Sequence, residues 1–314
     1  MADKEIRVFA PATVANVACG FDQLGFALSL PGDEVVVRFG DAPGLVITHI
    51  TGADGKLSCN PEKNTAGVSA LALLEALGKS DLGIEMEIHK KMPMGSGLGS
   101  SAASAVAGVF AVNELLGQPY NKRGLLPFAL EGEFLAHKAY VADNVSSSLL
   151  GGILLLRNVE HNLDVQPLPV PVDLYAAVVY PHIEVLTKSA RAILSPTITL
   201  KQHIEQSGNL GGLIVGLFRS DYDLIARSLN DVVIEPQRAH LIPHFYLVKE
   251  AALQAGALGC SISGSGPSIF ALCKGRDIAD YAGKAMQHIF QDAGIQNELF
   301  ISAINPDGAV KLPS

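Results

Sequence analysis

Three glycines alternate with other residues in one short stretch, and two serines follow them directly. Glycine has no side chain, so its backbone can approach an anion closely and point N–H groups at it. The serines are typical helix N-cap residues, and the positive end of a helix that begins there favours phosphate. We therefore predict a phosphate-binding loop that consists of Pro93, Met94, Gly95, Ser96, Gly97, Leu98, Gly99, Ser100, Ser101, Ala102 and Ala103.

This loop differs from two common nucleotide-binding motifs. No lysine lies between the last glycine and the serines, where a P-loop has one. The glycine spacing is Gly-x-Gly-x-Gly, which is not the spacing of a dinucleotide fingerprint. A tight strand-to-helix turn that uses glycine only for its geometry remains the alternative.

The segments on either side of the loop have the hydrophobic patterns of a sheet and two helices. Residues 64–77 carry apolar side chains at helical spacing, and Gly78 is a plausible terminator. A second helix should begin near Ser100 and end at Gly117, and its many small residues would allow close packing. Short β-branched or alternating runs predict strands of one sheet at residues 35–37, 45–47 and 84–88, with a further strand at 153–156.

A polar segment at residues 157–171 separates this half of the chain from a second one. We place the boundary within it, which gives an N-terminal domain of residues 1–165 and a C-terminal domain of residues 166–314. Both halves mix strands and helices, so the predicted fold class is α+β. In the second half we expect strands at 174–180, 258–263, 268–273 and 298–301 and helices at 199–218, 221–229, 242–255 and up to 292.

Composition indicates a compact globular protein, with 48% hydrophobic and 17% charged residues among 314. A net charge of -8 opposes broad attraction to nucleic acid or to an anionic membrane, and we expect neither as a partner. The four cysteines are widely spaced, which favours free thiols in a reducing cytoplasm over a zinc site or disulfides. No apolar stretch approaches the ~20 residues of a transmembrane helix, so a soluble protein is expected.

Three ordered motifs resemble those of the GHMP kinases, a family of small-molecule kinases. Pro93 to Ala103 is similar to the family signature, residues 10–22 resemble its first motif, and residues 264–268 resemble its glycine-rich third. Together the motifs span nearly the whole chain. The resemblance implies an S5-like N-terminal domain, a ferredoxin-like C-terminal domain, and ATP and Mg²⁺ as cofactors.

Four further stretches are similar to the homoserine kinase branch of this family, namely residues 16–25, 143–152, 187–191 and 235–243. This similarity implies phosphorylation of the hydroxyl of L-homoserine to O-phospho-L-homoserine in threonine biosynthesis. The family resemblance also suggests a homodimer. Another GHMP kinase, such as a mevalonate kinase, and a non-catalytic nucleotide or metabolite sensor are the alternatives.

The residues of these stretches suit a small zwitterion that carries a hydroxyl group. Arg191 and Arg238 are forked cations for the carboxylate, and Asn16 and Asp22 are acceptors for the ammonium and hydroxyl groups. Surface arginines, a turn aspartate and a capping asparagine are the structural alternatives. With the motif residues included, the predicted substrate-binding residues are Asn16, Asp22, Thr187, Arg191, Arg238 and Gly264.

The predicted metal ligands are the Ser101 hydroxyl and, by resemblance, the Glu133 carboxylate, with Glu131 as the fallback. A solvated helix face is the alternative for both glutamates. The predicted catalytic residues are Asn144 and Arg191. Many relatives have an aspartate as general base where this chain has Asn144, and an amide cannot accept that proton. The resemblance therefore implies that Asn144 orients the hydroxyl.

Five further residues carry expectations of their own. Asp143 is expected to face away from the site. Val141 stands where homoserine kinases often have a substrate-contacting histidine, and His137 is a possible substitute, although a surface or core role is favoured for it. Asn64 could contact adenosine or simply cap a helix. Cys19 is interpreted as a buried free thiol, because it has no basic neighbour in the sequence.

Overall fold

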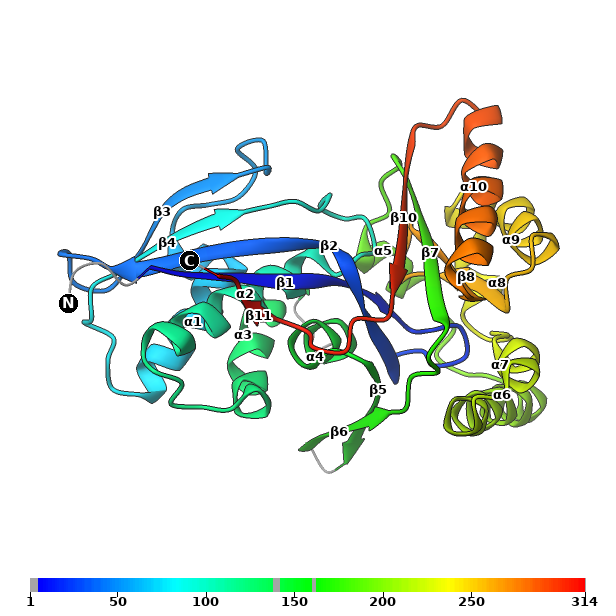
Figure 1. The fold of residues 1–314 in the computed structure, drawn as a ribbon, viewed down its shortest axis with the longest axis horizontal. Coiled ribbons are helices and arrows are strands. Elements are labelled where there is room, and N and C mark those ends of the chain that lie inside the picture. Colours follow the sequence, from blue (N-terminus) through cyan, green and yellow to red (C-terminus); the bar gives the residue numbers. More distant parts are fainter. Residues whose placement is uncertain (1–4, 138–141, 160–161, 314) are drawn as a thin grey trace.

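The computed structural model describes residues 5–137, 142–159 and 162–313 (Figure 1). A seven-stranded sheet forms the larger half, with its main path in the order β11, β1, β2, β4, β3, and β5 and β6 added beside β2. All of its pairs are antiparallel except β3 with β4, and the expected common sheet is confirmed. The strands are β1 (Ile6–Ala15), β2 (Leu24–Phe39), β3 (Leu45–Thr51), β4 (Ile84–His89), β5 (Ile153–Val159), β6 (Asn162–Leu168) and β11 (Val310–Lys311).

Helices cover one face of this sheet (Figure 1). They are α1 (Thr65–Ala76), α2 (Ser100–Leu115), α3 (Leu126–His137) and α4 (Ala142–Leu150), with short 3₁₀ turns η1 (Pro61–Lys63) and η2 (Lys122–Leu125). The small residues of α2 make it almost wholly buried. A Cβ at Gly108 would lie 2.4 Å from the carbonyl oxygen of Ala66, so glycine lets α2 lie directly against α1.

A four-stranded antiparallel sheet, in the order β10, β7, β9, β8, forms the second half. Its strands are β7 (Leu174–Pro181), β8 (Gly259–Ile262), β9 (Ile269–Lys274) and β10 (Asn297–Ala303). The helical segments are α5 (Thr187–Ala192), α6 (Leu200–Arg219), α7 (Tyr222–Ser228), α8 (Glu235–Arg238), η3 (Ala239–Leu241), α9 (Phe245–Gln254) and α10 (Arg276–Asp292). These positions confirm the periodicities expected for this half.

Successive side chains of the smaller sheet point to opposite faces, and each face packs into a different hydrophobic core. Ala177 and Val179 belong to the core under α9 and α10, whereas Ala176 and Val178 join the core of the larger half. Phe26 of β2 meets Phe270 of β9 edge to face, with ring centroids 6.1 Å apart. The two halves therefore share one continuous hydrophobic contact.

The last strand, β11, returns to the larger sheet and pairs with β1, so the chain crosses between the halves twice. A division of the chain into residues 1–165 and 166–314 stays a proposal. Within the described residues, no helix combines the length and the apolar character that a bilayer span needs.

Candidate active site

A cavity of about 510 Å³ lies where the two halves meet. Its lining comes from the loop before α2, from the segment after β1, from α3, α4 and α5, and from residues 264–265. The predicted site residues in this lining are Asn16, Asp22, Asn64, Met94, Gly95, Ser96, Gly97, Gly99, Ser100, Ser101, Glu133, Asn144, Thr187, Arg191, Arg238 and Gly264. The structure thus brings these predicted residues together around one cavity.

Four residues of the predicted phosphate loop do not line the cavity: Pro93, Leu98, Ala102 and Ala103. The last three are fully buried in the larger core. Leu98 therefore anchors the loop from below, while the glycines on either side of it face the cavity.

The loop has an unusual backbone that only its glycines adopt without strain. Gly95, Gly97 and Gly99 have φ angles of 68°, 80° and 70°. A Cβ at Gly97 would lie 2.6 Å from the carbonyl oxygen of Ser263, and one at Gly99 would lie 2.2 Å from Thr13 Oγ1. A Cβ at Gly95 would meet nothing within 4 Å. Two of the three glycines are thus required by close packing as well as by backbone angle.

Hydrogen bonds from distant segments hold the loop in this shape. The Thr13 N–H donates to the Leu98 carbonyl at 3.0 Å, and the Ser268 N–H donates to the Ser96 carbonyl at 3.1 Å. Ser263 Oγ donates to the Gly97 carbonyl at 2.7 Å. Because these carbonyls point into the protein, the backbone of the loop can offer its N–H side and the N-terminus of α2 to an anion.

The first turn of α4 places two polar side chains at the cavity. Thr13 Oγ1 donates a hydrogen bond of 2.6 Å to Asn144 Oδ1. Asp143 Oδ1 accepts the Asn144 N–H at 2.8 Å. Asp143 also lines the cavity, so the expectation that it faces away was wrong. Adjacent helical residues lie only about 100° apart, so both can border a cavity that meets the end of the helix.

Burial raises the pKa of the Asp143 carboxyl to about 7, and the nearby Asp22 adds to the effect. Glu133 raises this pKa further, whereas the Asn144 N–H and the Arg191 guanidinium lower it. An ammonium group that entered the cavity beside Asp143 would favour the ionised form. The ionisation of Asp143 therefore depends on the charge that lies beside it in the cavity.

Two arginines and an aspartate form a charged cluster in the cavity lining. Arg191 donates two hydrogen bonds to Asp22, at 3.0 and 2.9 Å, in a partly exposed pair. Arg238 is buried and donates to the carbonyls of Ala190 at 3.0 Å and Gly264 at 3.1 Å. The interpretation of Arg238 as a surface arginine is therefore excluded.

Phe21 and Asn16 line the cavity beside this charged cluster. The Phe21 ring lies 5.5 Å from the Arg191 guanidinium and 5.0 Å from that of Arg238. Asn16 Nδ2 donates to the Gly264 carbonyl at 2.7 Å, and Asn16 Oδ1 accepts the Asp22 N–H at 3.0 Å. Asn16 therefore fixes the turn that carries Asp22.

The two carboxylates considered as metal ligands differ in position. Glu133 is 2% exposed and lines the cavity together with Ser101, whereas Glu131 is exposed and lies outside the lining. The described residues hold no group of three acidic, histidine or cysteine side chains that could bind a metal ion. Mg²⁺ commonly uses one or two carboxylates, substrate phosphates and water, so one carboxylate and one hydroxyl fit this ion.

Three other residues have clear positions. Asn64 Oδ1 accepts the Ala66 N–H at 3.0 Å, which makes Asn64 the N-cap of α1, and it also lines the cavity. Thr187 Oγ1 lies 3.1 Å from Ser265 Oγ. Cys19 is a buried free thiol, as expected, and burial with the nearby Asp231 raises its pKa to about 12. Val141 lies outside the described residues, and so does the side chain of His137.

Sequence reasoning missed several residues of the cavity. Phe21 sits inside the first motif, where its position between Gly20 and Asp22 was the available signal. Lys90 and Ser104 line the cavity beneath the phosphate loop. The sequence carries no signal that distinguishes these two residues, because a lysine after a strand and a serine in a helix are commonly surface residues.

Comparison with known proteins decides the family. The model of the GHMP kinase N-terminal domain matches residues 64–152, and that of the GHMP kinase C-terminal domain matches residues 213–291. The chain belongs to the GHMP kinase family. The motif-based prediction of this family is confirmed, as is its two-part α+β architecture.

Within the GHMP kinases, the similar relatives include proteins named homoserine kinase. That of Chlorobium phaeobacteroides (strain BS1) is 48% identical over 98% of this chain and 99% of its own length. The homoserine kinase of Chloroherpeton thalassium is 47% identical over 98% of this chain and 99% of its own length. A crystal structure of homoserine kinase from Cytophaga hutchinsonii has 54% identity and a TM-score of 0.96, and covers 99% of this chain and 98% of that one.

More distant GHMP kinase structures share the fold alone. The L. major mevalonate kinase has a TM-score of 0.74 at 18% identity and covers 97% of this chain and 99% of its own. The fold is therefore common to enzymes named for different substrates, and substrate choice must depend on the residues that line the cavity.

We predict that Gly99→Ala damages the GHMP phosphate loop far more than Gly95→Ala does. Both positions have a left-handed backbone, which costs about 1–2 kcal/mol for alanine. Only the Cβ at position 99 collides with Thr13 and Asn144, which adds about 1–3 kcal/mol. Urea unfolding and the KM for ATP measure both effects. Equal losses for the two variants would contradict the packing argument.

A second prediction concerns pH. The folded-state pKa of Asp143, about 7, lies above its unfolded value of 3.8, so its burial costs stability increasingly as pH rises from 4 to 8. Asp143→Asn keeps an oxygen that can accept the Asn144 N–H but carries no charge. The variant should match wild type near pH 4 and exceed its free energy of unfolding at pH 8 by up to about 4 kcal/mol. A difference that is constant with pH would refute the raised pKa.

Proposed function

We propose that this chain is an ATP-dependent homoserine kinase, which transfers the terminal phosphate of ATP to the hydroxyl of L-homoserine and forms O-phospho-L-homoserine. Such a reaction belongs to threonine biosynthesis. The observation that carries the proposal is one cavity whose lining combines the glycine loop with the charged side chains of Asp22, Arg191 and Arg238. Asn144 lies in the lining of the same cavity.

The phosphate loop supports the role of ATP. The glycine loop and the N-terminus of α2 bind the phosphates through backbone N–H groups, and their positions are fixed before the nucleotide arrives. Phosphoryl transfer needs mainly positioning and charge stabilisation. A rigid loop therefore supplies much of what this reaction demands.

Ser101 and Glu133 would hold Mg²⁺ beside the phosphates. The ion, when bound, offsets the negative charge that the transfer develops. Burial of Glu133 keeps bulk water away from that carboxylate. Asn64, at the N-terminus of α1, contacts the nucleotide from the same side of the cavity.

Asn144 orients the hydroxyl of homoserine. Its Oδ1 already accepts from Thr13 Oγ1 and has a second lone pair with which it can accept from the substrate hydroxyl. The amide does not take the proton, which leaves with the phosphate or through solvent. Asp143 holds the backbone of Asn144 and presents a carboxyl group to the cavity.

The amino and carboxylate groups of the substrate fit the charged side chains of the cavity. Arg191 and Arg238 bind the carboxylate, while Asp22 and Asn16 bind the ammonium group. Before substrate binds, Arg191 and Asp22 neutralise one another in a half-exposed ion pair. Separating such a pair costs little free energy, because solvent screens both charges. Thr187 and Gly264 also line the cavity. When the zwitterion binds, the Arg191–Asp22 ion pair is replaced by two ion pairs, one to the substrate carboxylate and one to its ammonium group.

Charge also separates this proposal from its alternatives. Mevalonate has a carboxylate but no ammonium group, so it would compete with Asp22 for Arg191 and bring no cation in exchange. A sensor would need no acceptor-orienting group beside its phosphate loop. A homodimer and a cytoplasmic location complete the proposal as predictions from the sequence, and the partner of the protein is its small-molecule substrate.

A substrate panel tests the proposal directly. ADP release should depend on L-homoserine and should be at background with mevalonate and with galactose. ³¹P NMR should identify a phosphomonoester of homoserine as the product. Release with mevalonate alone would refute the substrate assignment, and binding of ATP with no release on any acceptor would favour a sensor.

Two substitutions should separate the roles in the acceptor site. Asn144→Ala should lower kcat by about 100-fold, because the hydroxyl loses its alignment, with little change in ATP binding. Arg191→Met should instead raise the KM for homoserine by about tenfold or more, because a charge-assisted bond is lost. Steady-state kinetics with each substrate varied measures both.

Lys188→Met is the matched control for Arg191→Met. Lys188 lies on the same helix, is exposed and is outside the cavity lining. Its removal should leave both KM values unchanged. An Asn144→Ala variant with wild-type turnover would remove that residue from the reaction.

A further inference from the structure

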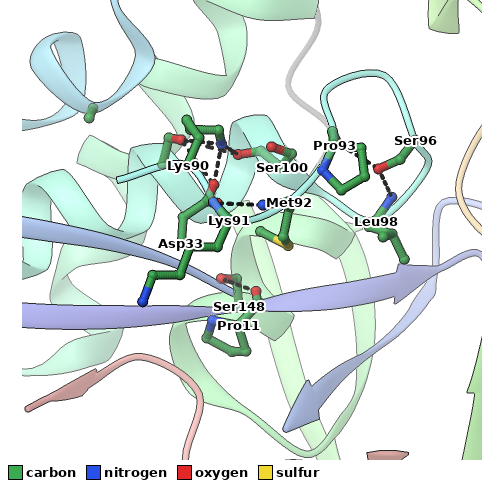
Figure 2. A network of polar contacts seen from close by, with 12 residues as sticks. Pro11, Asp33, Lys90, Lys91, Met92, Pro93, Ser96, Leu98, Ser100 and Ser148 are labelled. Atoms are coloured by element: carbon green, nitrogen blue, oxygen red, sulfur yellow. Dashed lines mark hydrogen bonds and ion pairs between the residues drawn. The ribbon is translucent and has the colours of Figure 1, made fainter. Parts of the chain in front are cut away.

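A buried ion pair lies beneath the phosphate loop (Figure 2). Asp33 of β2 is fully buried, and Lys90, directly after β4, is 7% exposed. The Lys90 ammonium group contacts the Asp33 carboxylate in an ion pair. The sequence analysis gave neither residue a role, and the proposed mechanism does not use them.

Asp33 fixes the chain where it enters the phosphate loop. Its Oδ1 accepts the N–H groups of Lys91 at 2.8 Å and Met92 at 3.2 Å. These two residues directly precede Pro93, the first residue of the loop. Figure 2 shows these bonds on the side of the loop that leads in from β4.

Lys90 fixes the chain where it leaves the loop. Its Nζ donates to the Ser100 carbonyl at 2.9 Å and to Ser104 Oγ at 2.8 Å. Both acceptors belong to the beginning of α2, whose N-terminus faces the cavity. The pair therefore connects the two ends of the phosphate loop through one buried contact.

The hydrogen bonds of Lys90 also define what it does not do. An ammonium group has three N–H donors, and Asp33, Ser100 and Ser104 accept from all three. Although Lys90 lines the cavity, it has no donor to spare for a phosphate oxygen. It differs in this from the lysine of a P-loop, which donates to the phosphates directly.

Stability alone is a weak explanation for such a pair. The desolvation cost of two buried charges commonly matches or exceeds their attraction, and apolar residues of similar volume are often as stable. What apolar residues could not provide is the set of directed bonds to Lys91, Met92, Ser100 and Ser104. These bonds hold the loop ends at a fixed separation.

We propose that Asp33 and Lys90 are positioning residues, which set the affinity for the ATP phosphates by holding both ends of the loop in register. The inference rests on the proposed function only in that the loop binds the phosphates of ATP. It does not depend on which acceptor is phosphorylated.

The double variant Asp33→Asn, Lys90→Met provides the test. It removes both charges of the pair, the new amide oxygen can still accept from Lys91 and Met92, and the methionine fills the space of the lysine stem. The bonds to Ser100 and Ser104 are lost. We expect an unfolding midpoint near wild type, a Kd for ADP about tenfold higher by calorimetry, and a KM for ATP raised alike. The KM for the acceptor should stay within about twofold.

Lys91→Met is the matched control, because its ammonium group pairs with Glu34 outside the cavity lining. It removes the same charge one residue away and should leave ADP binding unchanged. A folded double variant with wild-type affinity for ADP would overturn the proposal, and so would a parallel rise in both KM values, which indicates general distortion.

Ser104→Ala decides the matter if the double variant does not fold. It removes one acceptor of Lys90 and leaves the ion pair intact, so a loss of about threefold in ADP affinity is expected. Unchanged affinity would overturn the proposal. ADP binding is measured without an acceptor, so an inactive wild type that binds ADP would contradict the proposed function and leave the positioning role standing.

Discussion

The packing of the phosphate loop against two distant segments is the constraint on which the rest of this structure depends. Gly97 lies against the carbonyls of Ser263 and Gly266, and Gly99 lies against Thr13 and Asn144, at distances that leave no room for a Cβ. A loop of this backbone shape has no stability of its own. It exists because residues from the start and the end of the chain close around it.

The same contacts join the proposed phosphate site to the proposed acceptor site. The Gly264 carbonyl accepts from both Asn16 and Arg238, and the Gly264 N–H donates to the Ala15 carbonyl at 3.1 Å. Thr13 links the loop to Asn144. Contacts to the backbone of Gly264 therefore fix the position of Asn16 and Arg238 relative to the glycine loop. Such preorganisation is what a transfer reaction that relies on alignment requires.

Local sequence patterns foretold much of this arrangement. The glycine and serine spacing located the phosphate loop, and the hydrophobic periodicity located α1, α2 and the strands of both sheets. The family motifs brought in Asn16, Asp22 and Arg191. Each of these signals lies within a few residues of chain, where strand and helix periods apply.

The rest depends on contacts between residues far apart in the chain. Asp33 and Lys90 are separated by 57 residues, and no local sequence pattern around either residue predicts their contact. The Asp143 side chain lies in the cavity lining because the cavity meets the first turn of α4, and no sequence pattern shows that cavity. The buried state of Arg238 follows from the carbonyls of Ala190 and Gly264, which no periodicity reveals.

A crystal structure with L-homoserine and a non-hydrolysable ATP analogue tests the central claim most directly. The account predicts the terminal phosphate at the N-terminus of α2, the homoserine hydroxyl beside Asn144 and in line with that phosphate, and the carboxylate on Arg191 and Arg238. Homoserine bound outside this cavity, or with its hydroxyl turned away from the phosphate, would contradict it.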